Sequence, residues 1–92
     1  MDAVRNDAAA GRYELDAGGA VAFAAYERAG DVVTFTHTVV PEAARGGGVA
    51  TRLIAGALAD VRARGLRIVP RCSFVARHVA AHPETRDLLA AG

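Results

Sequence analysis

The chain has 92 residues, of which 52% are hydrophobic and 23% are charged, and its formal net charge is +1. This composition is typical of one small globular domain and excludes a disordered chain, so we expect a single domain over residues 1–92. The nearly balanced charge argues against a nucleic-acid partner or an anionic membrane surface.

Cysteine content and hydropathy indicate the compartment. Cys72 is the only cysteine, which excludes an internal disulfide and favours a reducing environment. No apolar run approaches the roughly 20 residues that span a bilayer. Residues 1–15 lack the apolar segment of a signal peptide. We therefore expect a cytoplasmic protein without a membrane partner.

The first part of the chain predicts antiparallel strands. Residues 12–17 alternate between polar and apolar, as a half-buried strand does. Gly18-Gly19 is a hairpin turn signal, and residues 20–28 continue as the second strand. Residues 32–40 are almost entirely β-branched or aromatic, which predicts a third strand.

The second part predicts a helix between two strands. Apolar residues recur on one helical face over 49–64, with Gly65 as the stop signal. Residues 66–70 predict a short strand, and the long connection allows it to pair in parallel with 32–40. The sequence thus predicts an α+β fold in which antiparallel strands precede a β-α-β unit.

Two short helices are expected at the end of the chain. Ser73 is a candidate N-cap for a helix over 74–81. Pro83 is expected to open a last helix over 84–90.

Three glycines, at positions 46–48, lie between the strand over 32–40 and the long helix. The free N–H groups of a helix start bind anions, and glycine lets a phosphate approach the backbone closely. The P-loop pattern is absent because the chain contains no lysine, and the G-x-G-x-x-G pattern is absent as well. A phosphate cradle is therefore our interpretation, with a glycine hinge without chemical consequence as the alternative.

The segment Arg45-Gly46-Gly47-Gly48-Val49-Ala50 resembles the [QR]-x-x-G-x-[GA] pyrophosphate loop of the GNAT acetyltransferases. The stretches FTHTVVPEAARGGGVA, RIVPRCSFV and HPE are similar to the small single-domain GNAT-like family, and the resemblance covers about residues 12–89. It implies a minimal GNAT-like fold in which the two parallel strands splay apart.

The resemblance also implies the cosubstrate acetyl-CoA and the residues that hold it. Its pantetheine arm would pair with the backbone of Val39 and Val40. Its pyrophosphate would lie on the loop and the helix start, at Arg45, Gly46, Gly47, Gly48, Val49, Ala50 and Thr51.

The candidates for catalysis are Cys72 and His37. Cys72 matches the family's cysteine after the second parallel strand, where it could carry the acetyl group or protonate the leaving sulfur, or it could be a buried core residue. Val39 replaces a glutamate of the family pattern, so His37 is the candidate base, with a partly exposed histidine as the alternative. Phe74 and Val75 occupy the region where many larger GNAT enzymes have an acidic tyrosine.

Two further pairs are weaker candidates. His78 and His82 have i,i+4 spacing, but no H-E-x-x-H motif is present, and we predict no metal site. Arg71 and Arg77 could meet the 3′-phosphate or adenine end of CoA, or could be solvated surface residues.

The resulting hypothesis is an acetyl-CoA-dependent N-acetyltransferase. The small size predicts an open acceptor groove, which favours an amine on a protein or peptide, or a partner subunit that completes the wall. The alternatives are a weakly catalytic or non-catalytic CoA-binding module and a scaffold that binds no CoA. Nothing in the sequence distinguishes a monomer from a homodimer.

Overall fold

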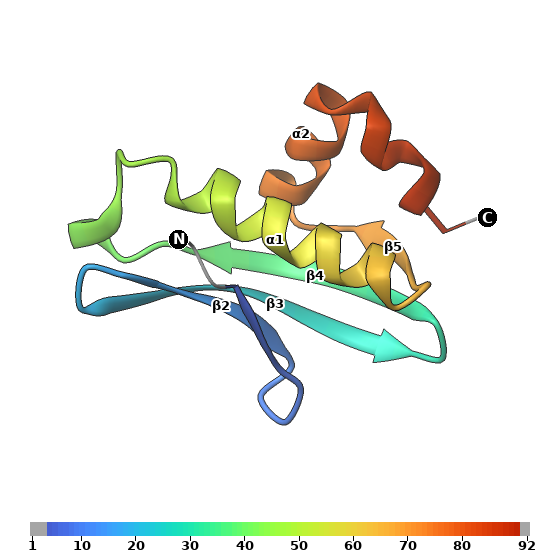
Figure 1. Cartoon of the computed structure of the whole chain (residues 1–92), viewed down its shortest axis with the longest axis horizontal. Helices are drawn as coiled ribbons and strands as arrows, with labels where there is room; N and C mark the ends of the chain where they lie inside the picture. The colour runs from blue at the N-terminus through green and yellow to red at the C-terminus, as the bar shows by residue number, and fades with distance from the viewer. Residues whose placement is uncertain (1–3, 91–92) are drawn as a thin grey trace.

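The computed structural model describes residues 4–90 (Figure 1). Its strands are β1 (Arg5–Asp7), β2 (Arg12–Ala17), β3 (Ala20–Ala29), β4 (Val32–Val39) and β5 (Arg67–Pro70). Its helices are η1 (Glu42–Ala44), α1 (Val49–Ala63), α2 (Ser73–Ala81) and η2 (Pro83–Leu88), of which η1 and η2 are 3₁₀ helices. The predicted α+β architecture is confirmed.

The five strands form one sheet in the order β1-β2-β3-β4-β5. Neighbours from β1 to β4 are antiparallel, whereas β4 and β5 are parallel, as the β-α-β pattern predicts. Strand β1 was not predicted, because three polar residues carry no alternation. Its pairing with β2 and the 2.9 Å ion pair between Arg5 and Glu14 hold it at the sheet edge.

Helix α1 lies across one face of the sheet and buries the apolar stripe that the sequence shows (Figure 1). The core beneath it joins helix and sheet residues, the largest of them Tyr13, Phe35, Leu15, Leu53, Ile54 and Ile68. Within α1, Asp60 and Arg64 form an i,i+4 ion pair at 2.8 Å. No helix among residues 4–90 is long and apolar enough to cross a membrane.

The end of the chain differs from the prediction in two ways. Ser73 does not cap α2: Cys72 occupies the N-cap position, without a side-chain hydrogen bond to the helix. The helix expected over 84–90 is instead the 3₁₀ helix η2, followed by a bridge from Leu89 to Ile68. Arg62 holds η2 through two bonds to the Asp87 carboxylate at 2.7 and 2.8 Å, so tertiary contacts override the local helical preference.

A register shift separates the two halves of β4. Phe35 pairs with Tyr26, but the next pair is His37 with Ala25, which leaves Thr36 as an extra residue in β4. Such a bulge reverses the faces of the residues that follow it. Thr38 therefore lies opposite the buried Ala24 on the face that α1 covers, and His37 lies on the other face.

Candidate functional site

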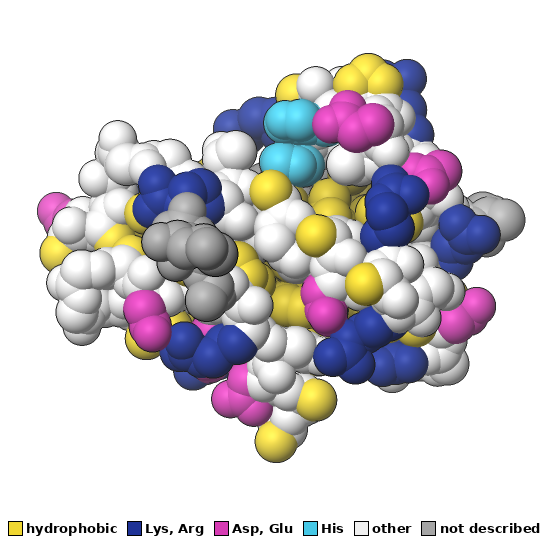
Figure 2. Space-filling model, viewed as in Figure 1, with side chains coloured by type: hydrophobic (Ala, Val, Ile, Leu, Met, Phe, Trp, Pro, Cys, Tyr) yellow, Lys and Arg dark blue, Asp and Glu magenta, His cyan; other side chains and the backbone are white. Residues whose placement is uncertain are grey.

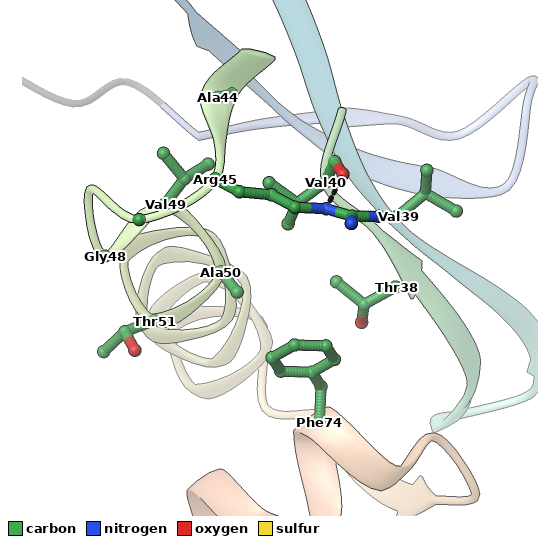
Figure 3. Close-up of a pocket in the computed structure, with 11 residues that line it drawn as sticks. Thr38, Val39, Val40, Ala44, Arg45, Gly48, Val49, Ala50, Thr51 and Phe74 are labelled. Carbon is green, nitrogen blue, oxygen red and sulfur yellow. Dashed lines mark hydrogen bonds between the residues drawn. The ribbon is translucent and has the colours of Figure 1, made fainter. Parts of the chain in front are cut away.

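A groove of about 500 Å³ opens where β4 ends and α1 begins (Figure 3). Its walls come from the end of β4, the glycine turn, the first turn of α1 and the start of α2. The lining residues are Thr38, Val39, Val40, Ala44, Arg45, Gly46, Gly48, Val49, Ala50, Thr51 and Phe74. None of these is an aspartate, a glutamate or a histidine.

The glycine turn places open backbone at one end of the groove. Gly48 is the N-cap residue of α1 and has φ of +70°, a left-handed conformation that side chains disfavour. A Cβ atom built at Gly46 or Gly48 would meet nothing within 4 Å, so the space above both is empty of protein. The turn therefore leaves room for a ligand to approach the main chain.

The start of α1 adds amide donors to this end. The first hydrogen bond of α1 runs from the N–H of Arg52 to the carbonyl of Gly48, at 3.0 Å. No described side chain caps the helix. The amides of Val49, Ala50 and Thr51 precede this first helical bond and so remain available as donors. Together with the helix dipole, they favour an anion at this end.

Two arginines surround the turn. The side chain of Arg45 reaches across the groove, and its Nε donates to the carbonyl of Val40 at 3.2 Å (Figure 3). Arg52 donates from Nη1 to the carbonyl of Gly47 at 2.7 Å and so braces the loop from outside the groove. Both guanidinium groups raise the positive potential around the turn.

The strand β4 offers an unpaired edge along the groove. Its pairing with β5 runs from Val32 to Phe35 and ends at Pro70. The carbonyl of Phe35 accepts the N–H of Cys72 at 2.9 Å, where the chain turns away into α2. No described strand pairs with this edge of β4 beyond Phe35. An extended ligand with amide groups has backbone partners there.

Cys72 lies behind the groove, not in its lining. Its side chain is 5% exposed, and its Sγ is 3.2 Å from the Oγ1 of Thr38, which does line the groove. Thr38 is the link between the buried sulfur and the open space. The sequence did not identify Thr38 as a site residue, because strict alternation along β4 places it on the opposite face.

His37 is not brought together with Cys72. It lies on the outer face of the sheet, where its ring contacts that of Phe23 edge-on with centroids 6.1 Å apart. Its Nδ1 is 3.2 Å from the Oγ1 of Thr36. The side chain is exposed to solvent on that face.

Beyond Phe74 the groove continues into a second hollow of about 290 Å³. Arg77 and His78 of α2 line it together with His82, which follows α2, and the two histidine rings are stacked with centroids 4.0 Å apart. Figure 2 shows two histidine side chains side by side on this face of the molecule. Burial, and then the nearby His82, lower the pKa of His78. Within residues 4–90, no group of three or more side chains of the metal-binding types is close enough to hold an ion.

Of the nine backbone and side-chain positions that the resemblance assigned to the cosubstrate, eight line the groove and Gly47 does not. The residues that the sequence did not assign are Thr38, Ala44 and Phe74 in the lining and Arg52 behind the loop. No local pattern in the sequence marks Phe74: it is 45% exposed, and it enters the lining because α2 packs beside the start of α1.

The parts of the groove have distinct chemistry. The glycine turn and helix start can bind phosphate, the edge of β4 can bind an amide-bearing chain, and Thr38 can donate a hydrogen bond at the inner end. The sequence model of the GCN5-related N-acetyl-transferase family matches residues 12–88 of the chain. No curated protein matches it.

Proposed function

The chain belongs to the GCN5-related N-acetyltransferase family, and from this premise we propose that it transfers the acetyl group of acetyl-CoA to an amine. The observation that carries the proposal is the convergence of three features on one groove: the open edge of β4, the glycine turn and the first amides of α1. A diphosphate linked to a chain of amides, as in CoA, has complementary groups along the whole groove.

The coenzyme would lie with its pyrophosphate on the turn. The amides of Val49, Ala50 and Thr51 would donate to its oxygens, and Arg45 would add charge from the rim. The pantetheine amides would pair with the backbone of Val39 and Val40. The adenosine end would then reach the second hollow, where Arg77 is available for the 3′-phosphate.

The acetyl group would lie at the inner end of the groove, near Thr38. Transfer requires an amine nitrogen to attack the thioester carbon, after which the C–S bond breaks and its electron pair goes to sulfur. Among residues 4–90, no carboxylate or imidazole lines the groove to take the amine proton. An amine acceptor that arrives deprotonated, with solvent as the final proton acceptor, satisfies this arrangement.

The positions of the two candidate catalytic residues favour a second candidate function, a CoA-binding module with weak or no catalysis. His37 faces away from the groove and Cys72 is buried behind it. Binding would survive such an arrangement, because it depends on backbone groups.

Two measurements test these proposals. Calorimetric titration with acetyl-CoA should show binding under both, and absence of binding would refute both. Release of CoA thiol from acetyl-CoA, with a short lysine-containing peptide as the acceptor, separates them: turnover above the protein-free rate supports the transferase, and binding without turnover supports the module.

Intact-mass measurement after incubation with acetyl-CoA tests the role of Cys72. A stable acetyl adduct on Cys72 would support a covalent step through the sulfur. An unchanged mass agrees with direct transfer, which the burial of the sulfur favours.

A further inference from the structure

We propose that Thr38, held by the buried Cys72, donates a hydrogen bond to the sulfur of the coenzyme and stabilises it as a leaving group. This inference rests on the proposed binding of CoA in the groove. It assigns the contact with the reacting sulfur to Thr38 and gives Cys72 a positioning role behind it.

The position of Thr38 follows from the bulge in β4. The extra residue Thr36 turns Thr38 toward α1, opposite the buried Ala24. Thr38 projects from β4 into the groove and faces Ala50 and Phe74 (Figure 3). It lies three residues past Phe35, where pairing with β5 ends, and so at the inner end of the unpaired edge.

Within the described part of the chain, Thr38 is the only residue with a hydroxyl at this end of the lining. The other one, Thr51, belongs to the first turn of α1 and is exposed. Of the remaining lining side chains only that of Arg45 carries polar hydrogens, and its Nε is bonded to the carbonyl of Val40 at 3.2 Å. Thr38 is therefore the uncharged side-chain donor at the inner end.

The proposed role requires the thiol of Cys72 to donate to Thr38 and not to accept from it. The Sγ of Cys72 is 3.2 Å from Oγ1 of Thr38, and either atom can be the donor. When the thiol donates to Oγ1, the single hydroxyl hydrogen of Thr38 is free to point into the groove. Cys72 itself is fixed by its N–H bond to Phe35 and by its place at the start of α2.

The hydrogen bond would act mainly in the transition state. A thioester sulfur is a weak acceptor, but negative charge collects on it as the C–S bond breaks and the electron pair moves to sulfur. A donor aimed at that atom gains strength as the charge develops, which lowers the barrier. The sulfur finally takes a proton and the amine nitrogen loses one, both by exchange with solvent, so no proton is consumed.

The first test compares turnover in variants of similar shape. Thr38→Val removes the hydroxyl and should lower the rate of thiol release by about 10- to 100-fold, with acetyl-CoA affinity within about twofold of the unmodified protein. Thr38→Ser should retain most of the rate. Thr34→Val makes the same change on β4 outside the groove and controls for effects on the strand.

The second test does not require transfer. CoA is bound to the protein, and the ionisation of its thiol is followed by thiolate absorbance. The same titration with S-methyl-CoA, which has no free thiol, gives the absorbance of Cys72, and this is subtracted. A donor at Thr38 favours the thiolate, so the bound thiol should ionise about tenfold more readily than in Thr38→Val. Thr38→Ser should resemble the unmodified protein.

The outcomes are distinct. Equal turnover and equal thiol ionisation in the unmodified protein and Thr38→Val would overturn the inference while leaving the proposed function intact. A larger loss in Cys72→Ala than in Thr38→Val would assign the chemistry to Cys72 and also overturn it. Absence of CoA binding by the unmodified protein would refute the proposed function, and this inference with it. If the protein binds CoA but shows no turnover, the thiol ionisation measurement alone decides whether the inference holds.

Discussion

The hydroxyl of Tyr13 donates a hydrogen bond of 2.7 Å to Oδ2 of Asp60, and this bond ties β2 to α1 at a distance of 47 residues along the chain. The same carboxylate oxygen accepts from Nε of Arg64 at 2.8 Å. Tyr13 is 2% exposed, and its ring packs at 6.1 Å from that of Phe35. Burial, and then the bond to Asp60, raise the pKa of the Tyr13 hydroxyl. The contact therefore anchors the helix whose first turn forms the groove.

We expect Tyr13→Phe to lower the free energy of unfolding by about 1 to 2 kcal/mol, since it removes a hydrogen bond to a charged group and leaves the ring in place. Urea denaturation measures the change. Arg64→Ala, which removes an exposed i,i+4 partner of the same carboxylate, should cost below about 0.5 kcal/mol. A loss as small in Tyr13→Phe as in Arg64→Ala would contradict the anchoring role.

Gly48→Val should raise the dissociation constant for acetyl-CoA by about tenfold or more. The added side chain enters the open space above the turn and displaces phosphate from the amides, each such charged bond being worth about 1.5 to 3 kcal/mol. Calorimetric titration measures the change.

Positive φ alone costs a side chain about 1 to 2 kcal/mol, so the Gly48 variant needs a matched control. Gly65 after α1 has φ of +69°, close to the +70° of Gly48, and equally open space above it. Gly65→Val should therefore destabilise the protein to a similar extent and leave acetyl-CoA affinity unchanged. Equal affinity in both variants would refute the phosphate cradle.

Gly56 in α1 is expected to resist substitution by alanine. In an open helix the change stabilises by about 1 kcal/mol, but a Cβ at Gly56 would overlap Cγ2 of Val4. We expect Gly56→Ala to destabilise the protein by about 1 to 3 kcal/mol by overpacking.

The contact with Val4 can be separated from helix propensity by a double-mutant cycle. In a Val4→Gly background, which removes the clashing atoms, Gly56→Ala should stabilise the protein relative to Val4→Gly alone. The four unfolding free energies give the coupling. Additive effects of the two changes on the free energy of unfolding would show that contact with Val4 is not what destabilises the Gly56→Ala variant.

His78 should make stability depend on pH below neutrality. Burial and the adjacent His82 lower its pKa from the ordinary value of about 6.5, so the unfolded chain takes up the proton first. Stability is therefore fully present above about pH 6.5 and falls as the pH decreases through the lower pKa of the folded state. Urea midpoints between pH 7.5 and 5 measure the slope, which His78→Gln should reduce. An unchanged slope in His78→Gln would place the acid sensitivity elsewhere.

Most of the fold follows from local patterns. The alternation over 12–17, the β-branched run over 32–40 and the helical stripe over 49–64 each identified an element within one or two residues of its bounds. Strand β1 escaped prediction because it depends on its pairing with β2. The helix expected over 84–90 is present only as the 3₁₀ helix η2, which Arg62 and Arg67 hold through Asp87.

The sequence by itself determined the glycine turn and the helix that follows it, because turn and helix preferences act between neighbours in the chain. The resemblance to the family, and not a local preference, supplied the eight positions that line the groove. Only the tertiary structure decided which side chains share that groove. One extra residue in β4 turns Thr38 inward and His37 outward. The register of β4 against β3 determines where this extra residue lies. Packing at the start of α2 then buries Cys72 behind Thr38, a contact between residues 34 positions apart that no local pattern encodes.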